Sequence, residues 1–195
     1  MEPLRIHGSE SDPNEVRRAI AVLFEDEYVV ELRVLDARKN GRKFGTVSGY
    51  FDGKNREAMA AAADEWSGNA VGVYFTLNPV DPACLGRAAN RVKDWAKHAT
   101  KEDEILCRRL LLIDVDAGQP SGVSATDAEH EAAIDLARRI GAWLSSLGWP
   151  KPFFVDSGNG AHLYYRIALP NDAKSTALVK AVLIAVDQYR ISLDL

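Results

Sequence analysis

Residues 110–116, with the sequence LLLIDVD, constrain the fold of this chain more than any other segment. An apolar run of this length is typical of a strand that is buried on both faces. Two carboxylates, Asp114 and Asp116, stand one residue apart at its C-terminal end. Because residues i and i+2 of a strand point to the same side, we expect Asp114 and Asp116 to project together from a buried sheet.

Two neighbouring carboxylates repel each other, and each then tends to take up a proton. A divalent cation removes this conflict, and Mg²⁺ and Mn²⁺ prefer oxygen ligands. The pair Asp114 and Asp116 therefore indicates a metal site. The alternative is that one aspartate begins a loop and the other caps a turn, and the pair alone does not decide between the two.

The composition is that of an ordinary globular protein. The chain has 195 residues, of which 47% are hydrophobic and 27% are charged. It has no apolar run long enough for a membrane span and no apolar signal segment at the N-terminus. Its two cysteines, Cys84 and Cys107, do not make a disulfide framework or a structural zinc site by themselves. We expect a cytoplasmic protein with no membrane partner.

The net charge of −4 does not by itself indicate nucleic-acid binding, but a local basic patch matters more than the total. One such patch surrounds a predicted tight turn at Asn40-Gly41 and consists of Arg38, Lys39, Arg42 and Lys43. We expect these four residues to contact a nucleic-acid template, with an ordinary surface loop as the alternative.

The periodicity of apolar residues predicts a chain of the α+β class. We expect helices from Pro13, over 55–66, over 85–98, after Thr126 and after a cap at Asn171 or Asp172, with His130 on the solvent side of its helix. We expect strands at 28–35, 44–51, 71–77, 110–116, 153–155, 162–167 and 191–195. From residue 110 onward the order is strand, helix, hairpin, helix, strand, which is close to the split β-α-β arrangement.

A second group of candidate residues lies in the turn of the predicted hairpin, residues 157–162, with the sequence SGNGAH. Glycines allow close backbone approach to a ligand, and the N–H groups of such a turn can form an anion-binding nest. Ser157, Gly158, Asn159 and Gly160 would form the nest, and His162 could donate to a phosphate. A plain hairpin turn with a satisfied histidine is the alternative.

The third candidate is Asp194, which follows Ser192-Leu193 in the predicted last strand. Alone it indicates nothing more than an exposed aspartate. A two-metal nucleotidyl transfer site needs carboxylates and a phosphate-binding group, because two cations about 3.5–4 Å apart hold a triphosphate and activate a hydroxyl. The residues that would meet this need are Asp114, Asp116, Asp194 and the turn with His162. Asp187, in the predicted final helix, is a weaker substitute for the third ligand.

These three segments, in this order, resemble the catalytic domain of the archaeo-eukaryotic primase superfamily, in its primase-polymerase branch from phages, plasmids and mobile elements. LIDVD at 112–116 is similar to the first metal-binding motif of the family, SGNGAHL at 157–163 to the second, and Leu193-Asp194 to the third. Segments 48–52, 74–79 and 148–150 add supporting similarity.

The resemblance implies a primase catalytic core that covers residues 1–195, with an N-terminal α/β unit (1–105) packed on a C-terminal unit (106–195) like an RNA-recognition fold. It implies template-directed primer synthesis on single-stranded DNA from nucleoside triphosphates, with Mg²⁺ or Mn²⁺ as cofactor. It further implies a role in replication of a mobile element or phage, together with a replicative helicase. In this family the third motif continues into further sheet, so we expect the chain to be C-terminally truncated.

Two other functions stay open at this point. An incomplete metal site would leave a replication-associated DNA-binding module without catalysis. The same carboxylates would also suit a metal-dependent phosphohydrolase.

Overall fold

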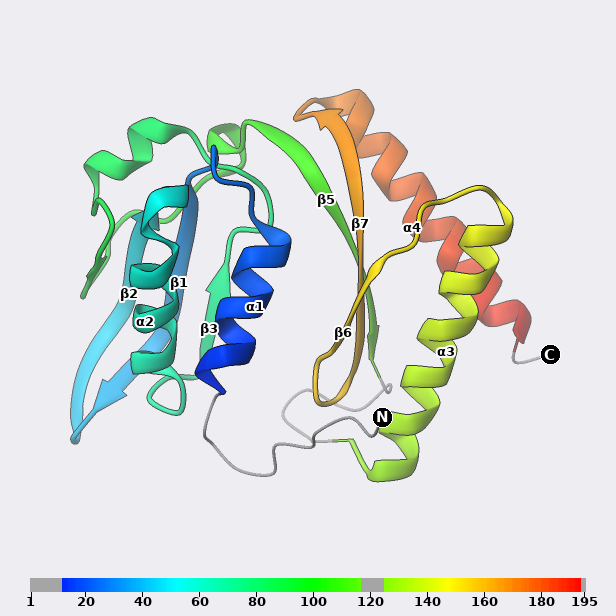
Figure 1. The fold of residues 1–195 in the computed structure, drawn as a ribbon, viewed down its shortest axis with the longest axis horizontal. Helices are drawn as coiled ribbons and strands as arrows, with labels where there is room; N and C mark the ends of the chain where they lie inside the picture. Colours follow the sequence, from blue (N-terminus) through cyan, green and yellow to red (C-terminus); the bar gives the residue numbers. More distant parts are fainter. Residues whose placement is uncertain (1–11, 117–124, 194–195) are drawn as a thin grey trace. The chain divides into compact units, whose positions relative to one another are not determined.

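The computed structural model describes residues 12–116 and 125–193. The chain is of the α+β class, as predicted, with antiparallel strand pairs and helices. It divides into two compact units between Cys107 and Arg108, each with its own sheet and helices (Figure 1). In the described part of the chain, no helix is long and apolar enough to cross a membrane.

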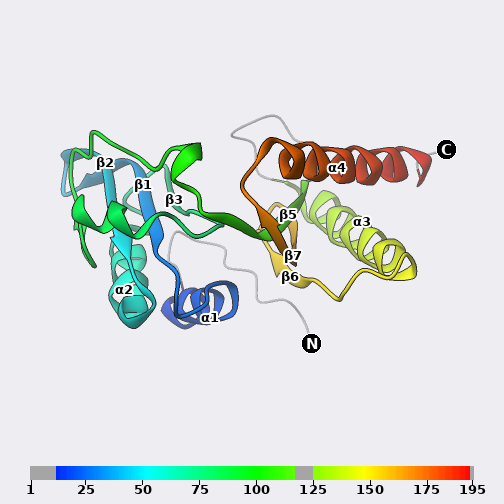
Figure 2. The same ribbon diagram turned by 90° about the horizontal axis from the view of Figure 1, so that it is seen from above.

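The N-terminal unit contains a four-stranded sheet in the order β3-β1-β2-β4. Its strands and helices are α1 (Pro13–Leu23), β1 (Val30–Lys39), β2 (Arg42–Phe51), α2 (Arg56–Trp66), β3 (Gly72–Phe75) and β4 (Val92–Lys93). Three short 3₁₀ helices complete it: η1 (Gly53–Asn55), η2 (Pro82–Gly86) and η3 (Glu102–Glu104). Helices α1 and α2 cover one face of the sheet (Figures 1 and 2), where Leu32, Phe51 and Met59 are buried in one apolar cluster.

Local signals explain the first elements. The side chain of Asp12 accepts a hydrogen bond from the Asn14 N–H (2.9 Å), and Pro13 occupies the first turn of α1, where its missing N–H does no harm. The β1–β2 hairpin turns at Asn40 and Gly41, which have φ angles of 51° and 74°. Asn-Gly is the sequence that best accepts two left-handed residues in succession, as the turn prediction required.

The C-terminal unit contains a three-stranded sheet in the order β5-β7-β6. Its elements are β5 (Cys107–Asp116), α3 (Asp127–Ser146), β6 (Phe153–Asp156), β7 (Gly160–Pro170) and α4 (Ala173–Leu193). Strands β6 and β7 are antiparallel. Helices α3 and α4 lie on the same face of this sheet (Figures 1 and 2) and close one core with Ile113, Leu163 and Tyr165.

The predicted helix at 85–98 is wrong. Residues 82–86 form η2, and the following segment pairs with β2 instead of continuing as a helix. The N–H of Tyr50 donates to the Ala88 carbonyl (3.0 Å), and the N–H of Asn90 donates to the Tyr50 carbonyl (2.7 Å). Asn90 and Trp95 have φ angles of 53° and 51°, which a helix cannot contain. Tertiary pairing has overridden helix propensity here.

The predicted strand at 191–195 is wrong for its first three residues, because α4 continues to Leu193. The last turns of α4 are held by Tyr189, whose ring stacks on Trp143 of α3 at a centroid distance of 4.4 Å. Asp194 lies outside the described residues, so the structure places Leu193 in a helix and says nothing of the third predicted metal ligand.

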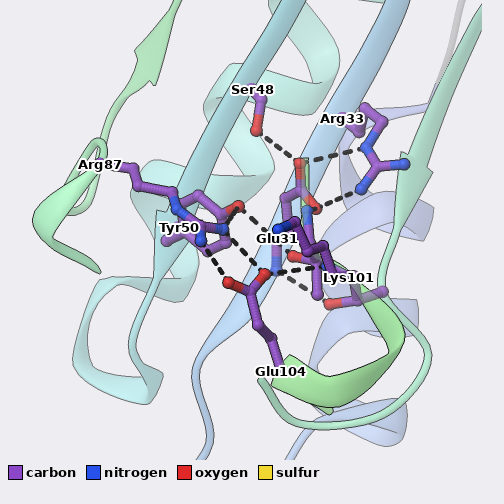
Figure 3. Close-up of polar contacts among 9 residues, drawn as sticks. Glu31, Arg33, Ser48, Tyr50, Arg87, Lys101 and Glu104 are labelled. Atoms are coloured by element: carbon purple, nitrogen blue, oxygen red, sulfur yellow. Dashed lines mark hydrogen bonds and ion pairs between the residues drawn. The ribbon is translucent and has the colours of Figure 1, made fainter. Parts of the chain in front are cut away.

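A polar cluster is buried in the N-terminal unit, on the sheet face away from α1 and α2 (Figure 3). The carboxylate of Glu31 on β1 is 0% exposed. It accepts hydrogen bonds from Arg33 (2.6 and 3.1 Å), from Ser48 on β2 (2.6 Å) and from the backbone N–H of Thr100 (3.0 Å). Burial alone raises the pKa of Glu31, but these hydrogen bonds outweigh it, so the pKa is lowered below its usual range.

Arg87 and Glu104 form an ion pair beside this cluster (Figure 3). Arg87 also donates to the hydroxyl of Tyr50 (3.0 Å) and lowers the pKa of Glu104 to about 2. The polar cluster around Glu31 and the ion pair of Arg87 with Glu104 connect β1 and β2 to the segment that leads into β5. Glu31 and Arg33 alternate with apolar residues along β1, as on a strand with one solvent-facing side, but the segment that contains Thr100 covers that side.

Candidate functional site

The first two candidate residues lie where the sequence predicted them, at the end of β5. Ile113 and Val115 are buried in the core against α3 and α4, while Asp114 and Asp116 are exposed. Strand alternation therefore turns both carboxylates away from the core, to the same side of the strand. β5 is an edge strand of its sheet, and β7 is its neighbour.

His162 of β7 contacts this pair. Its Nε2 lies 3.2 Å from Oδ1 of Asp114, and its Nδ1 lies 3.1 Å from the hydroxyl of Tyr164. Tyr164 is two residues further along β7, so the two side chains share a face, and their rings meet edge to face at 5.7 Å. The result is a chain of three polar groups, Tyr164, His162 and Asp114, across two neighbouring strands.

The electrostatics of the aspartate pair favour a cation. Burial raises the pKa of Asp114, His162 opposes this rise, and the charge of Asp116 adds to it. Burial also raises the pKa of Tyr164, and the charge of Asp114 adds to that shift. A cation at Asp114 and Asp116 would favour the ionised form of Asp114 against the burial, and against the smaller repulsion by Asp116, that raise its pKa.

The turn between β6 and β7 is tighter than the predicted anion nest. Three of its four N–H groups are hydrogen bonded within the chain: Ser157 to the Gly160 carbonyl (3.0 Å), Gly158 to the Asp156 carboxylate (2.8 Å) and Gly160 to the Ser157 hydroxyl (3.1 Å). The side-chain oxygen of Asn159 accepts from the Ala125 N–H (3.3 Å), at the start of α3. A phosphate that bound the N–H of Ser157, Gly158 or Gly160 would have to displace one of these bonds.

Asp156 and Gly160 fix the turn on either side. Oδ1 of Asp156 lies 2.9 Å from Nε2 of His130, which is only 7% exposed on α3. The prediction that His130 lies on the solvent side is therefore wrong, because its ring is held by Asp156. A Cβ added at Gly160 would overlap the carbonyl oxygen of Val115, so only glycine lets β7 approach the end of β5 this closely.

A cavity of about 710 Å³ opens beside the aspartate pair, within the C-terminal unit. Most of its lining is apolar and comes from the core side of β5 and from the helices, such as Ile113, Val115 and Leu136; the charged residues at its rim are Asp114, Asp116, Glu129 of α3, and Asp187 and Arg190 of α4. Arg190 donates to Asp187 (2.9 and 3.0 Å), so this substitute for the third ligand is in an ion pair. Among the residues that the structure describes, no three His, Cys, Asp or Glu side chains lie close enough to share a metal ion.

The four predicted template residues lie in the N-terminal unit and differ in their partners. Arg38 is in an ion pair with Asp36 (2.7 Å), and Lys39 is in one with Glu65 (3.1 Å). The guanidinium of Arg42 lies 5.2 Å from the ring centroid of Phe44, and Lys43 is exposed. Two of the four charges are therefore balanced by carboxylates of the protein itself.

Sequence reasoning missed Tyr164, His130 and the cavity-lining residues Glu129 and Arg190. The signals for two of them were present. Tyr164 follows His162 at the strand period, and His130 precedes Ala133 and Ala137 at the helical spacing of the core face. The helices α3 and α4 bring Glu129 and Arg190 to the cavity through tertiary packing, which no local pattern encodes.

Comparison of the chain with protein-family models, with curated proteins and with solved structures finds no match.

Proposed function

We propose that this chain is a template-directed nucleotidyltransferase of the primase-polymerase type, which joins nucleoside triphosphates on a single-stranded DNA template. One observation carries the proposal: Asp114 and Asp116 end one strand, and His162 contacts Asp114 (3.2 Å) from the neighbouring strand, next to a Ser-Gly-Asn-Gly turn. Two carboxylates that would bind a cation and a histidine that would bind phosphate therefore lie on neighbouring strands of one sheet.

The order of the elements supports the same proposal. Helix α3 connects β5 to β6, and β7 lies between these two strands in the sheet. Both helices pack on one face. This is the strand order of a split β-α-β unit, the arrangement of RNA-recognition folds and of the C-terminal unit of primases. Asp114, Asp116 and His162 then belong to the face that the helices leave open.

The roles of the residues follow from their chemistry. Asp114 and Asp116 would hold Mg²⁺ or Mn²⁺, because their oxygens are hard ligands and because a cation would offset the burial and the charge of Asp116 that raise the pKa of Asp114. When bound, the metal supplies neutralisation of phosphate charge and activation of the attacking hydroxyl. His162 is oriented by Tyr164 through its Nδ1 (3.1 Å), and its Nε2, which lies 3.2 Å from Asp114, would have to leave that carboxylate to donate to a phosphate oxygen. Ser157 and Asn159 would add short polar contacts.

The test is incorporation of labelled nucleotides on a single-stranded DNA template, with and without Mg²⁺ or Mn²⁺. We expect Asp114→Ala and Asp116→Ala to lower the rate by at least about 10²–10³-fold, because charge stabilisation is the main source of such catalysis. Asp135→Ala is the matched control, since Asp135 is an exposed aspartate on α3. Full activity in the Asp114→Ala, Asp116→Ala double variant would sink the proposal.

A second candidate is a DNA-binding module of the replication machinery without catalysis. The observation that favours it is that Asp187, the carboxylate of α4 that shares the cavity with Asp114 and Asp116, is in an ion pair with Arg190. Tight binding of single-stranded DNA, with no incorporation even in Mn²⁺, would select this candidate.

A further inference from the structure

A tryptophan and three lysines gather along the β2 side of the N-terminal unit, which we define as the Trp95 surface: Lys43, Lys93, Trp95 and Lys97. Lys93 of β4 pairs with Ser48 of β2. Beyond β4 the chain stays beside β2, because the N–H of Trp95 donates to the Phe44 carbonyl (3.0 Å) and that of Ala96 to the Thr46 carbonyl (2.8 Å). Residues that lie fifty positions apart in the sequence thus become neighbours.

Lys93 of β4 points to the face of the sheet that lies away from α1 and α2. Ser48 bonds to Glu31 on the face away from α1 and α2, so its cross-strand partner Lys93 shares that face. Phe44 packs edge to face on Trp66 of α2 and therefore faces the helices. Lys43 lies beyond a register shift between Gly45 and Lys43, where it pairs with Arg38 of β1.

Trp95 presents a large, flat apolar surface to solvent. Its side chain is 58% exposed, and its φ of 51° is unusual for a tryptophan. The ring lies on Gly45 of β2, where an added Cβ would be 2.6 and 2.8 Å from two ring carbons. The absence of a side chain at Gly45 thus lets the six-membered ring of Trp95 pack against β2, and the strained backbone of residue 95 keeps an aromatic group at the surface where burial would be favourable.

The charge around Trp95 is positive in a chain whose net charge is −4. Residues 91–101 contain four Lys or Arg and one Asp. Within the described part of the chain, Lys43, Lys93 and Lys97 form no ion pair, whereas Arg38 and Lys39 of the same hairpin are paired with Asp36 and Glu65. The positive charge that is left for an external anion therefore lies on Lys93 and Lys97 of the Trp95 segment and on Arg42 and Lys43 of the hairpin.

We propose that the Trp95 surface binds single-stranded nucleic acid, with Trp95 stacking on an unpaired base and the three lysines contacting phosphates. An exposed ring suits an unstacked base, because the bases of a duplex are already stacked on each other. As a template contact this inference rests on the proposed function, whereas as a binding surface it does not require catalysis.

The test is the Kd of the whole chain for a fluorescent 20-nucleotide oligo-dT, measured by anisotropy in EDTA and without nucleoside triphosphates. We expect Trp95→Leu to raise the Kd about 5- to 150-fold, the effect of one stacked base. Trp95→Phe, which keeps a ring, should restore most of the affinity. A melting curve for each variant separates lost binding from lost folding, and wild-type affinity of a folded Trp95→Leu variant would overturn the proposal.

The lysines are tested by the salt dependence of the same Kd. We expect the double variant Lys93→Gln, Lys97→Gln to reduce the slope of log K against log salt by about 1.4, because each phosphate contact on a single strand contributes about 0.7. The matched control is Arg18→Gln with Lys54→Gln, which removes the same charge from exposed positions on α1 and η1. An equal change of slope in the control would mean a general charge effect, and equal affinity for a duplex of the same length would rule out stacking; either result overturns the proposal.

These experiments can refute the Trp95 surface and the proposed function independently of each other. If Trp95-dependent binding is found in EDTA but no nucleotide is incorporated with Mn²⁺, the proposed function is wrong and the Trp95 surface stands. If incorporation is found and folded Trp95 and lysine variants bind and extend the template as the wild type does, the surface is wrong and the proposed function stands.

Discussion

At the scale of single residues, Asp114 is the side chain whose ionisation the fold disfavours. Burial, together with Asp116, raises the pKa of Asp114. A carboxyl group with a raised folded-state pKa destabilises the fold once the pH is above that pKa, and has no effect below the unfolded value of about 3.9. We expect Asp114→Asn to raise the melting temperature in EDTA at pH 7 by at most about 2–4 °C, since the group is half exposed.

The pH dependence is the diagnostic part of this measurement. The gain from Asp114→Asn should shrink toward zero as the pH falls to about 3, where the aspartate of the wild type is also neutral. Asp135→Asn, on the exposed side of α3, should change the melting temperature at neither pH. A loss of stability in Asp114→Asn at pH 7 would contradict the expectation and would mean that the contact with His162 dominates.

The residues that sequence reasoning placed correctly are those whose position depends on a local period. Alternation along β5 placed Asp114 and Asp116 on the same side, and the capping spacing placed Thr126 at the start of α3, where its hydroxyl and Glu129 form a capping box. Glu31 could not be predicted as buried, because Ser48 and Thr100, which cover and satisfy it, are far away in the sequence. Its local pattern is that of a solvent-facing residue.

At the scale of elements, the approach of β7 to β5 depends on Gly160. An added Cβ would overlap the Val115 carbonyl, while at Gly158, with a φ of 86°, it would meet no atom within 4 Å. We expect Gly158→Ala to cost about 1–2 kcal/mol, the strain of a left-handed alanine. Gly160→Ala should cost more and should also separate His162 from Asp114, since backbone must move.

Chemical denaturation gives the two stabilities, and the NMR signals of the His162 ring report its contact with Asp114. We expect the ring signals to shift in Gly160→Ala and to stay in place in Gly158→Ala. Equal effects of the two alanines on both readouts would contradict the role given to Gly160.

The Glu31 cluster joins β1, β2 and the segment before η3. Glu31→Gln leaves Arg33 without its carboxylate, and breaking a buried ion pair costs about 3–5 kcal/mol. Because Arg33 is about one third exposed, we expect the lower end of that range, which lowers the melting temperature of this unit by roughly 10 °C. The control is Glu57→Gln, which removes the exposed partner of Arg17 and should change the melting temperature by no more than about 2–4 °C.

The sign of the pH dependence follows from the pKa of Glu31, which is lowered. Such a group stabilises the fold above the unfolded pKa of about 4.3, and this contribution is lost as the pH falls through the lower folded value. The difference in melting temperature between the wild type and Glu31→Gln should therefore be full at pH 7 and should narrow below pH of about 4. A constant difference would mean that packing, not charge, is lost.

Among the elements, the wrong predictions share one physical cause. The segment 85–98 has helical spacing of apolar residues, yet its backbone bonds to β2 and its Asn90 turns left-handed. Residues 191–193 are favourable for a strand, yet α4 extends over them, with Tyr189 stacked on Trp143. In both cases contacts with a partner remote in sequence decide the structure, so a local pattern was insufficient.

At the scale of the whole molecule, each unit closes its own core. The cluster that contains Ile113, Leu163 and Val186 draws its members from residues 111–189, and the three clusters around Leu32, Val80 and Val34 draw theirs from residues 16–105. The polar cluster around Glu31 and the ion pair of Arg87 with Glu104 also lie within the N-terminal unit. Among the described residues, the apolar groups that hold each sheet to its helices therefore belong to the same unit.

We therefore expect a fragment of residues 1–107 to fold alone. It keeps both helices, all four strands of its sheet and the bridge between Val80 and Ile105. A domain of about 100 residues unfolds with an enthalpy of about 60–80 kcal/mol, so calorimetry should show one cooperative transition of this size. Glu31→Gln should lower its melting temperature by as much as it lowers that of the same unit in the whole chain, because every partner of Glu31 is retained. A fragment with helical signal but no cooperative transition would show that the N-terminal unit needs residues beyond 107 to complete its fold.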